Sequence, residues 1–171
     1  EKVEVALNCC HGGLGEGGYV SAVLETNRIP YASPSVCASS VFLDKCMTKL
    51  IAKSLGIPTA PYLKITERDY KKRGTFLLRY AVTKLGFPMI VKPSKGGSSI
   101  GIKFVENEGE LRSAVENNFV FGTVIVEKYL EGKKDVNCGV YSLGGVMTVS
   151  KTEVVTDKNG VYGFADKYLT E

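Results

Sequence analysis

Two glycine-rich segments hold most of the side chains in this sequence that could take part in a reaction. The first contains His11 and Glu16 together with five glycines within eight residues: Gly12, Gly13, Gly15, Gly17 and Gly18. Such a density of glycine predicts positive φ angles or a backbone that closely approaches a small molecule. His11 and Glu16 are therefore candidate substrate contacts, although a lone histidine or glutamate on a turn is more often solvated.

The second segment, residues 92–101, combines glycines and hydroxyl groups with Lys92 and Lys95. Consecutive backbone N–H groups in such a loop can surround a phosphate. The segment is not a Walker A motif, because the order GxxxxGK[ST] is absent and the loop joins two expected strands, which disfavours a P-loop NTPase. The alternative is a flexible hairpin tip with solvated lysines, and the loop alone does not decide between the two.

A third stretch, Glu127-Lys128-Tyr129-Leu130, could form the edge of an adenine pocket. A backbone amide and carbonyl would read the base, an aromatic or aliphatic side chain would cover it, and Asp135 could hold the ribose hydroxyls. The competing interpretation is an amphipathic sheet edge, which these residues by themselves favour.

Composition narrows the classes of protein to which this chain can belong. The 171 residues are 44% hydrophobic and contain no long apolar run, which predicts a globular chain without a membrane span. The net charge of +4 comes from scattered lysines and arginines, which suits a small phosphate-bearing partner better than a nucleic acid. Five cysteines without a CxxC pair, and one histidine, suggest neither a disulfide framework nor a zinc site. We therefore expect a reducing, cytoplasmic compartment and no metal site within these residues.

The elements that must position these segments follow from periodicity and turn residues. The first glycine-rich segment separates an expected strand from a helix, and this is the end of a strand where open α/β sheets bind ligands. A helix capped by Ser39 or Ser40 should end near Gly56, with Lys45, Lys49 and Lys53 off its apolar stripe. Val3, Val5 and Leu7 alternate in the first expected strand, and a short extended piece is expected at 29–31. The further expected elements are strands at 62–65, 89–92, 100–105 and 123–130, a helix at 76–85, a helix through Val115, and a hairpin over 135–154 with a turn at Gly144-Gly145. A capped turn is expected at Thr66 with Asp69, and Asn107 with Glu110 should cap the helix through Val115.

Seven motifs, in this order and spacing, resemble the D-alanine:D-alanine ligase family. They are His11-Gly12-Gly13-x-Gly15-Glu16, Ile29-Pro30-Tyr31, the stretch from Ser39 to Asp44-Lys45, Gly56-Ile57-Pro58-Thr59, Val91-Lys92-Pro93 with Gly97-Ser98-Ser99-Ile100-Gly101, Glu127-Lys128-Tyr129-Leu130, and Asp166-Lys167-Tyr168. The resemblance implies an α+β (α/β) ATP-grasp fold, partial here, preceded by the end of a Rossmann-like domain. It assigns residues 1–38 to that pre-ATP-grasp domain, 39–128 to the first ATP-grasp subdomain, and 129–171 to the truncated start of the second.

The resemblance also implies roles for individual residues. Lys45 and Lys92 would contact the phosphates of ATP, under a loop that contains Ser98 and Ser99. Glu127, Lys128, Tyr129 and Leu130 would line the adenine pocket, with Asp135 at the ribose. His11 and Glu16 would face the first D-alanine, and Lys167 and Tyr168 would belong to the closing loop. Ser98, His11, Lys167 and Tyr168 are the candidates for catalytic residues.

The activity implied is ATP-dependent joining of two D-alanines through an acyl phosphate, with Mg²⁺, for peptidoglycan precursors. Asp135 stands where the family usually has Glu, and Gly17 where an acidic residue is common. The family's metal ligands and a catalytic Arg are expected after Glu171, so this chain alone should be an inactive part of a homodimeric enzyme. The alternatives are a ligase that uses D-lactate or D-serine, and a nucleotide-binding module without catalysis.

Overall fold

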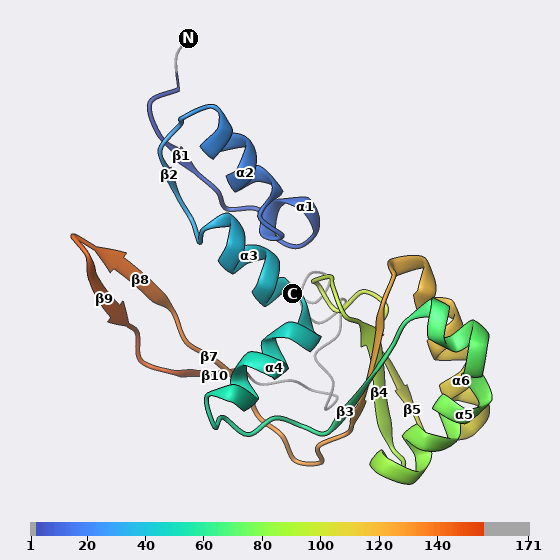
Figure 1. The fold of residues 1–171 in the computed structure, drawn as a ribbon. Coiled ribbons are helices and arrows are strands. Elements are labelled where there is room, and N and C mark those ends of the chain that lie inside the picture. The colour runs from blue at the N-terminus through green and yellow to red at the C-terminus, as the bar shows by residue number, and fades with distance from the viewer. Residues whose placement is uncertain (1–2, 156–171) are drawn as a thin grey trace, which may run out of the picture. The chain divides into compact units, whose positions relative to one another are not determined.

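The computed structural model describes residues 3–155, and Figure 1 shows their fold. The chain divides into two compact units, residues 1–129 and 130–171, and each is described by itself. The first unit contains β1 (Ala6–Leu7), α1 (Gly13–Glu16), α2 (Tyr19–Thr26), β2 (Tyr31–Ala32), α3 (Val36–Leu43), α4 (Lys45–Ser54), β3 (Tyr62–Ile65), α5 (Glu67–Leu85), β4 (Met89–Pro93), β5 (Lys103–Val105), α6 (Glu108–Asn118), a 3₁₀ turn (Phe119–Phe121) and β6 (Val124–Lys128).

The N-terminal part of the first unit is the expected strand, glycine-rich loop, helix and strand. β1 and β2 pair in parallel, with Ala6 opposite Tyr31 and Leu7 opposite Ala32. The strands are shorter than the alternation of Val3, Val5 and Leu7 suggested. A residue counts as part of a sheet only where it pairs with a residue of a neighbouring strand, and only two pairs form here.

The predicted cap at Ser39 or Ser40 is wrong, because both serines lie inside α3. Ser35 caps α3 by accepting a hydrogen bond from the Ala38 amide, and Asp44 separates α3 from α4. The carboxylate of Asp44 accepts from the amides of Cys46 and Met47, which begins a second helix where the sequence suggested one continuous helix.

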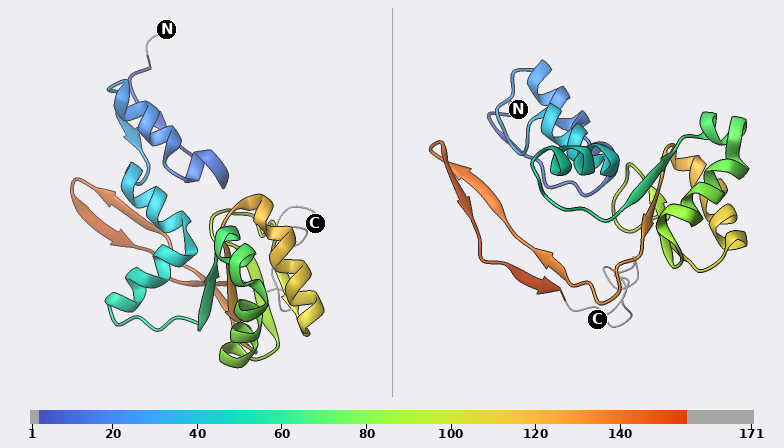
Figure 2. Two further views of the ribbon diagram at one scale, coloured as in Figure 1. Left: turned by 45° about the vertical axis from the view of Figure 1, so that its right-hand side comes forward. Right: turned by 60° about the horizontal axis from the view of Figure 1, so that its bottom comes forward.

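A four-stranded antiparallel sheet in the order β3-β6-β4-β5 forms the centre of this unit. One face packs against α5 and α6, which lie together on the same side of the sheet in Figure 2. The fully enclosed side chains of that core are apolar: Ile65, Ala81, Met89, Val91, Val105, Leu111, Val115, Val124 and Val126. Because side chains alternate along a strand, Ile90, Lys92, Ile125 and Glu127 lie on the opposite face.

Helix α5 is longer than predicted. It starts directly after Thr66, whose hydroxyl accepts from the Asp69 amide, and continues to Leu85 with non-helical φ and ψ angles at Arg73. The expected capped turn at Thr66 and the expected helix from Phe76 are therefore two halves of one interrupted helix. The capping pair Asn107 and Glu110 of α6 is confirmed. The Asn107 side-chain oxygen accepts a hydrogen bond from the Glu110 amide, and the Glu110 carboxylate accepts one from the Glu106 amide.

The second unit consists, in the described range, of two antiparallel strand pairs. β7 (Asp135–Asn137) pairs with β10 (Glu153–Val155), and β8 (Val140–Leu143) pairs with β9 (Val146–Val149). The predicted Gly144-Gly145 turn joins β8 to β9, and both glycines have positive φ. Across residues 3–155, none of the helices has the length and apolar character needed to cross a bilayer.

Leu111→Ala should lower the free energy of unfolding by about 2–5 kcal/mol, because Leu111 of α6 is fully enclosed in the apolar core. Leu50→Ala removes the same atoms from a side chain that is 53% exposed and should cost much less. Urea denaturation of both variants measures the difference. Equal losses would contradict the assignment of the core.

Candidate functional site

The face of the sheet that points away from α5 and α6 carries a group of charged side chains. The Lys92 ammonium lies 2.6 Å from Glu127 Oε2, and the Lys49 ammonium, from α4, lies 3.0 Å from Glu127 Oε1. Glu127 is only 7% exposed, so these two lysines supply the positive charge that such a buried carboxylate needs.

Lys45 lies at the first position of α4 and is the third lysine at this face. Its amide donates to the Ser94 carbonyl at 2.8 Å, and its ammonium donates to the Gly96 carbonyl at 3.0 Å. Burial lowers the pKa of Lys45, and the nearby Lys92 ammonium lowers it further, while Glu127, Asp44 and Glu16 oppose that change. Lys45 and Lys92 are therefore close enough to repel each other, and an anion between them would relieve that repulsion.

A buried polar joint holds α4 against the loop after β4. The Ser94 hydroxyl donates to Asp44 Oδ1 at 2.5 Å, and the Ser94 amide donates to the Thr123 carbonyl at 2.7 Å. Ser94 is 1% exposed. Since Asp44 precedes Lys45 and Ser94 follows β4, the joint fixes both phosphate candidates, Lys45 and Lys92, to one framework.

The loop between β4 and β5 has an unusual backbone. Ser98 and Ser99 both have positive φ, at 52° and 59°, a region that residues other than glycine rarely adopt. The base of the loop is fixed at Gly101, where a Cβ atom would lie 2.5 Å from Asn118 Oδ1 and 2.9 Å from Pro93. Strained loops of this kind are common where a protein clamps a ligand.

The two glycine-rich segments lie against each other. Glu16 Oε2 accepts a hydrogen bond of 2.7 Å from the Gly12 amide, and a Cβ atom on Gly97 would lie 3.2 Å from Gly12 Cα. The loop with His11 and Glu16 therefore borders the loop with Ser98 and Ser99.

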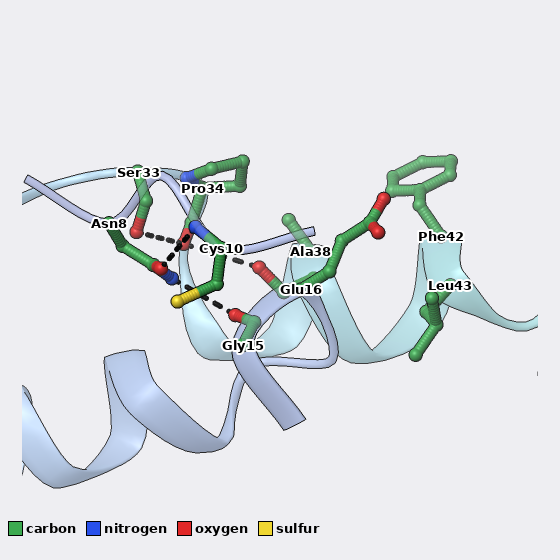
Figure 3. Close-up of a pocket in the computed structure, with 10 residues that line it drawn as sticks. Asn8, Cys10, Gly15, Glu16, Ser33, Pro34, Ala38, Phe42 and Leu43 are labelled. Atoms are coloured by element: carbon green, nitrogen blue, oxygen red, sulfur yellow. Dashed lines mark hydrogen bonds between the residues drawn. The ribbon is translucent and has the colours of Figure 1, made fainter. Parts of the chain in front are cut away.

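A pocket of about 230 Å³ opens beside Glu16 (Figure 3). The Asn8 amide donates to the Gly15 carbonyl at 3.0 Å, and its oxygen accepts from the Cys10 amide, which braces the glycine-rich segment on one side. Phe42 and Leu43 of α3 supply its apolar lining. The pocket has the size and mixed polarity of a site for a small polar molecule.

Comparison with known proteins gives the family. The family described as "D-ala D-ala ligase C-terminus" matches residues 51–171. The chain belongs to the D-alanine:D-alanine ligase family. It is 34% identical to the D-alanine–D-alanine ligase of Thermosipho africanus (strain TCF52B) over 168 residues, which cover 98% of this chain and 44% of that protein.

Solved structures of the same family have a similar fold. The chain resembles D-alanine–D-alanine ligase from Helicobacter pylori with a TM-score of 0.76 and 32% identity, over 90% of this chain and 47% of that one. The likeness to the ligase from Bacillus anthracis complexed with ATP has a TM-score of 0.65 and 32% identity, over 79% of this chain and 43% of that one. This chain thus spans about half the length of these relatives. The expected α+β ATP-grasp fold is confirmed.

The structure brings several of the family's motif residues together and leaves others apart. Lys45, Lys92 and Glu127 meet on one face of the sheet, and the loops of Glu16 and Ser98 lie side by side. His11 is exposed in its loop. Their roles at ATP and D-alanine stay predictions.

The remaining predicted residues lie at the end of the first unit or beyond it. The Lys128 ammonium donates to the Leu85 carbonyl at 3.0 Å, and Tyr129 packs edge-on against Phe104. Leu130 begins the second unit, in which Asp135 pairs with Lys133 at 2.8 Å. Lys167 and Tyr168 lie outside the described residues.

Sequence reasoning missed three residues that hold the site together: Lys49, Asp44 and Ser94. Lys49 follows Lys45 by one helical turn, so both project from the same side of α4. That spacing was a usable signal, although two lysines off an apolar stripe are more often solvated. The pairing of Asp44 with Ser94 joins residues 50 apart and leaves no local signal.

Asp44→Ala should destabilise the protein by about 0.5–2 kcal/mol at neutral pH, because it removes the cap of α4 and the Ser94 joint. Asp44→Asn should cost less, since an asparagine oxygen can still cap the helix. Urea denaturation at pH 7 measures both changes. A loss in Asp44→Asn as large as that in Asp44→Ala would contradict the cap.

The advantage of wild type over Asp44→Asn should disappear in acid. Burial alone would raise the pKa of Asp44, but hydrogen bonds from Ser94, Met47 and Cys46 outweigh it and hold that pKa below its usual range. Because the folded carboxyl binds a proton less readily than the unfolded one, its contribution is complete above the unfolded pKa of about 3.9 and is lost as pH falls through the lower folded pKa. Stability measured from pH 6 down to pH 2 checks this, and a difference that grows toward low pH would contradict it.

Proposed function

We propose that this chain is the nucleotide-binding part of a ligase that joins two D-alanines at the expense of ATP. The observation that carries the proposal is the convergence of Lys45, Lys92 and the serine loop on one side of the sheet. Two lysines that repel each other beside a loop with left-handed serines form a site that suits a polyphosphate. A relative of the same fold is complexed with ATP.

The proposed reaction has two steps. A D-alanine carboxylate oxygen attacks the γ-phosphorus of ATP, which breaks the bond to the β-γ bridging oxygen and yields an acyl phosphate and ADP. The amine of a second D-alanine then attacks the acyl carbon, and phosphate leaves. Both transition states gather negative charge on oxygens, so ammonium groups and backbone N–H groups fixed in place before the reaction stabilise them.

Within this scheme, each group of site residues has a proposed role. Lys45 and Lys92 hold the phosphates, Ser98 and Ser99 cover them, and residues 127–130 with Asp135 hold the nucleoside. His11 and Glu16 hold the first D-alanine. Mg²⁺ would neutralise charge on the phosphates. Among residues 3–155, no group of three His, Cys, Asp or Glu side chains could hold a metal ion.

The proposal extends to the complete protein that carries this chain. Residues 1–38, 39–128 and 129–171 would be the end of a pre-ATP-grasp domain, the first ATP-grasp subdomain and the start of the second. Lys167 and Tyr168 would close over the site and favour an amine as second substrate. The complete protein would be a cytoplasmic homodimer that acts on small molecules in peptidoglycan precursor synthesis.

Lys92→Met should weaken binding of Mg-ATP, because a charge-assisted hydrogen bond is worth about 1.5–3 kcal/mol, or roughly 10–150-fold in affinity. It should also lower stability, since Lys92 pairs with the buried Glu127 and is not the freely solvated lysine that a loop position would suggest. The control is Lys72→Met, which removes an equal charge from an exposed site on α5. Titration with a fluorescent ATP analogue compares the two, and equal affinities would contradict the phosphate site.

Activity is tested by ADP release from Mg-ATP with and without D-alanine, on the complete protein and on this chain. We expect D-alanine-dependent release by the complete protein and none by the chain alone. D-lactate and D-serine as second substrates test the choice of acceptor. ATP binding without turnover on any of these would instead indicate a nucleotide-binding module.

A further inference from the structure

The carboxylate of Glu127 is shared between two lysines with different surroundings. Its Oε2 contacts Lys92 at 2.6 Å, and its Oε1 contacts Lys49 at 3.0 Å. Within residues 3–155, Oε1 is enclosed and makes no hydrogen bond of good geometry, so the charge of Lys49 is what compensates it there. Each oxygen of one buried carboxylate therefore has its own ammonium group.

Lys49 is held from several directions by the protein. Besides Glu127, its ammonium donates to the Ala60 carbonyl at 3.1 Å and lies 5.3 Å from the centre of the Tyr62 ring. An ammonium group has three donors, and these three contacts use the directions in which it could reach a ligand. The side chain is 14% exposed. Lys49 is therefore placed to act on the protein and not on a substrate.

Lys92 differs from Lys49 in what surrounds its ammonium. In the part of the chain that the structure describes, its one ion-pair partner is Glu127, and the side chain is 20% exposed. Lys92 also lies on the same face as Lys45 and is close enough to lower the pKa of that lysine. Donors of Lys92 thus remain for an anion beside Lys45.

The balance of charge connects the two lysines. With Lys49 present, the three side chains carry a net charge of +1, and Glu127 divides its negative charge between two partners. Without Lys49 the net charge becomes zero, and the whole carboxylate acts on Lys92. At a separation below 3 Å in a poorly hydrated place, that attraction is strong enough to compete with a phosphate for the same ammonium.

We propose that Lys49 is a positioning residue for the phosphate-binding Lys92, and that it acts through Glu127 without touching the nucleotide. Lys49 satisfies one oxygen of the carboxylate, which leaves Lys92 oriented by the other oxygen but still available to an anion. The inference rests on the proposed function, since it assigns Lys92 to ATP.

The test compares KM for ATP and kcat in the complete protein, with D-alanine saturating. Lys49→Met should raise KM for ATP about tenfold, equivalent to about 1.4 kcal/mol, with a much smaller change in kcat. Lys49→Arg keeps the charge and should stay within about threefold of wild type, or about 0.7 kcal/mol. Lys53→Met removes an exposed lysine one turn further along α4 and should leave KM unchanged.

The decisive variant is the double substitution Lys49→Met with Glu127→Gln. It restores the net charge of +1 at the site, so KM for ATP should return most of the way from the value of Lys49→Met to that of Glu127→Gln alone, the reference variant that reports any direct contribution of Glu127 to nucleoside binding. A lysine that contacted ATP directly would give no such recovery. Urea denaturation of every variant separates loss of folded protein from loss of affinity.

The outcomes separate this inference from the proposed function. Unchanged KM in Lys49→Met, or a double variant no better than the single one, overturns the inference while the wild-type protein still turns over. Absence of D-alanine-dependent turnover in the wild-type protein overturns the proposed function itself. In that case, binding of Mg-ATP to the same variants still tests whether Lys49 supports Lys92.

Discussion

The arrangement of this site depends on one buried carboxylate placed among lysines. Glu127 lies on β6, one of the two inner strands of the sheet, with little exposure, and a charge in that position is tolerated only with cations against it. Lys92 comes from the neighbouring strand β4, and Lys49 comes from helix α4. The carboxylate therefore links the sheet to α4, and it holds two ammonium groups close together on this face.

A second polar contact also holds α4 in place. Asp44 and Ser94 bond to each other where α4 begins and where β4 ends, and each also fixes backbone amides or carbonyls around it. Buried groups that are fully hydrogen-bonded define a single geometry better than apolar contacts do. In this protein the apolar core on one face of the sheet supplies stability, while the polar contacts on the other face fix where α4 and the loop after β4 lie.

The sequence predicted those parts of the fold that local patterns encode. The strand at Tyr62, the Thr66 and Asn107 caps, the β4 strand and the Gly144-Gly145 turn follow from residues a few positions apart. The boundary at Asp44 was missed because the apolar pattern continues across it and only the carboxylate interrupts the helix. The family motifs likewise singled out Lys45 and Lys92 as candidate site residues. They did not reveal the pairing of Lys49 with Glu127, because those two residues are far apart in the chain. Contacts of that kind are set by tertiary packing, which periodicity does not record.

Gly12 and Gly97 bring the two glycine-rich loops into close contact, since a Cβ atom on Gly97 would lie 3.2 Å from Gly12 Cα. A shift in the backbone of one loop therefore acts on the other loop, so ligands bound to the two loops would be coupled. Linkage then makes the effect reciprocal: whatever factor the occupant of one loop imposes on the affinity of the other loop, the second occupant imposes on the first. Under the proposed function, the order in which D-alanine and ATP enter can differ in rate, but the free energy of filling both loops is the same by either route.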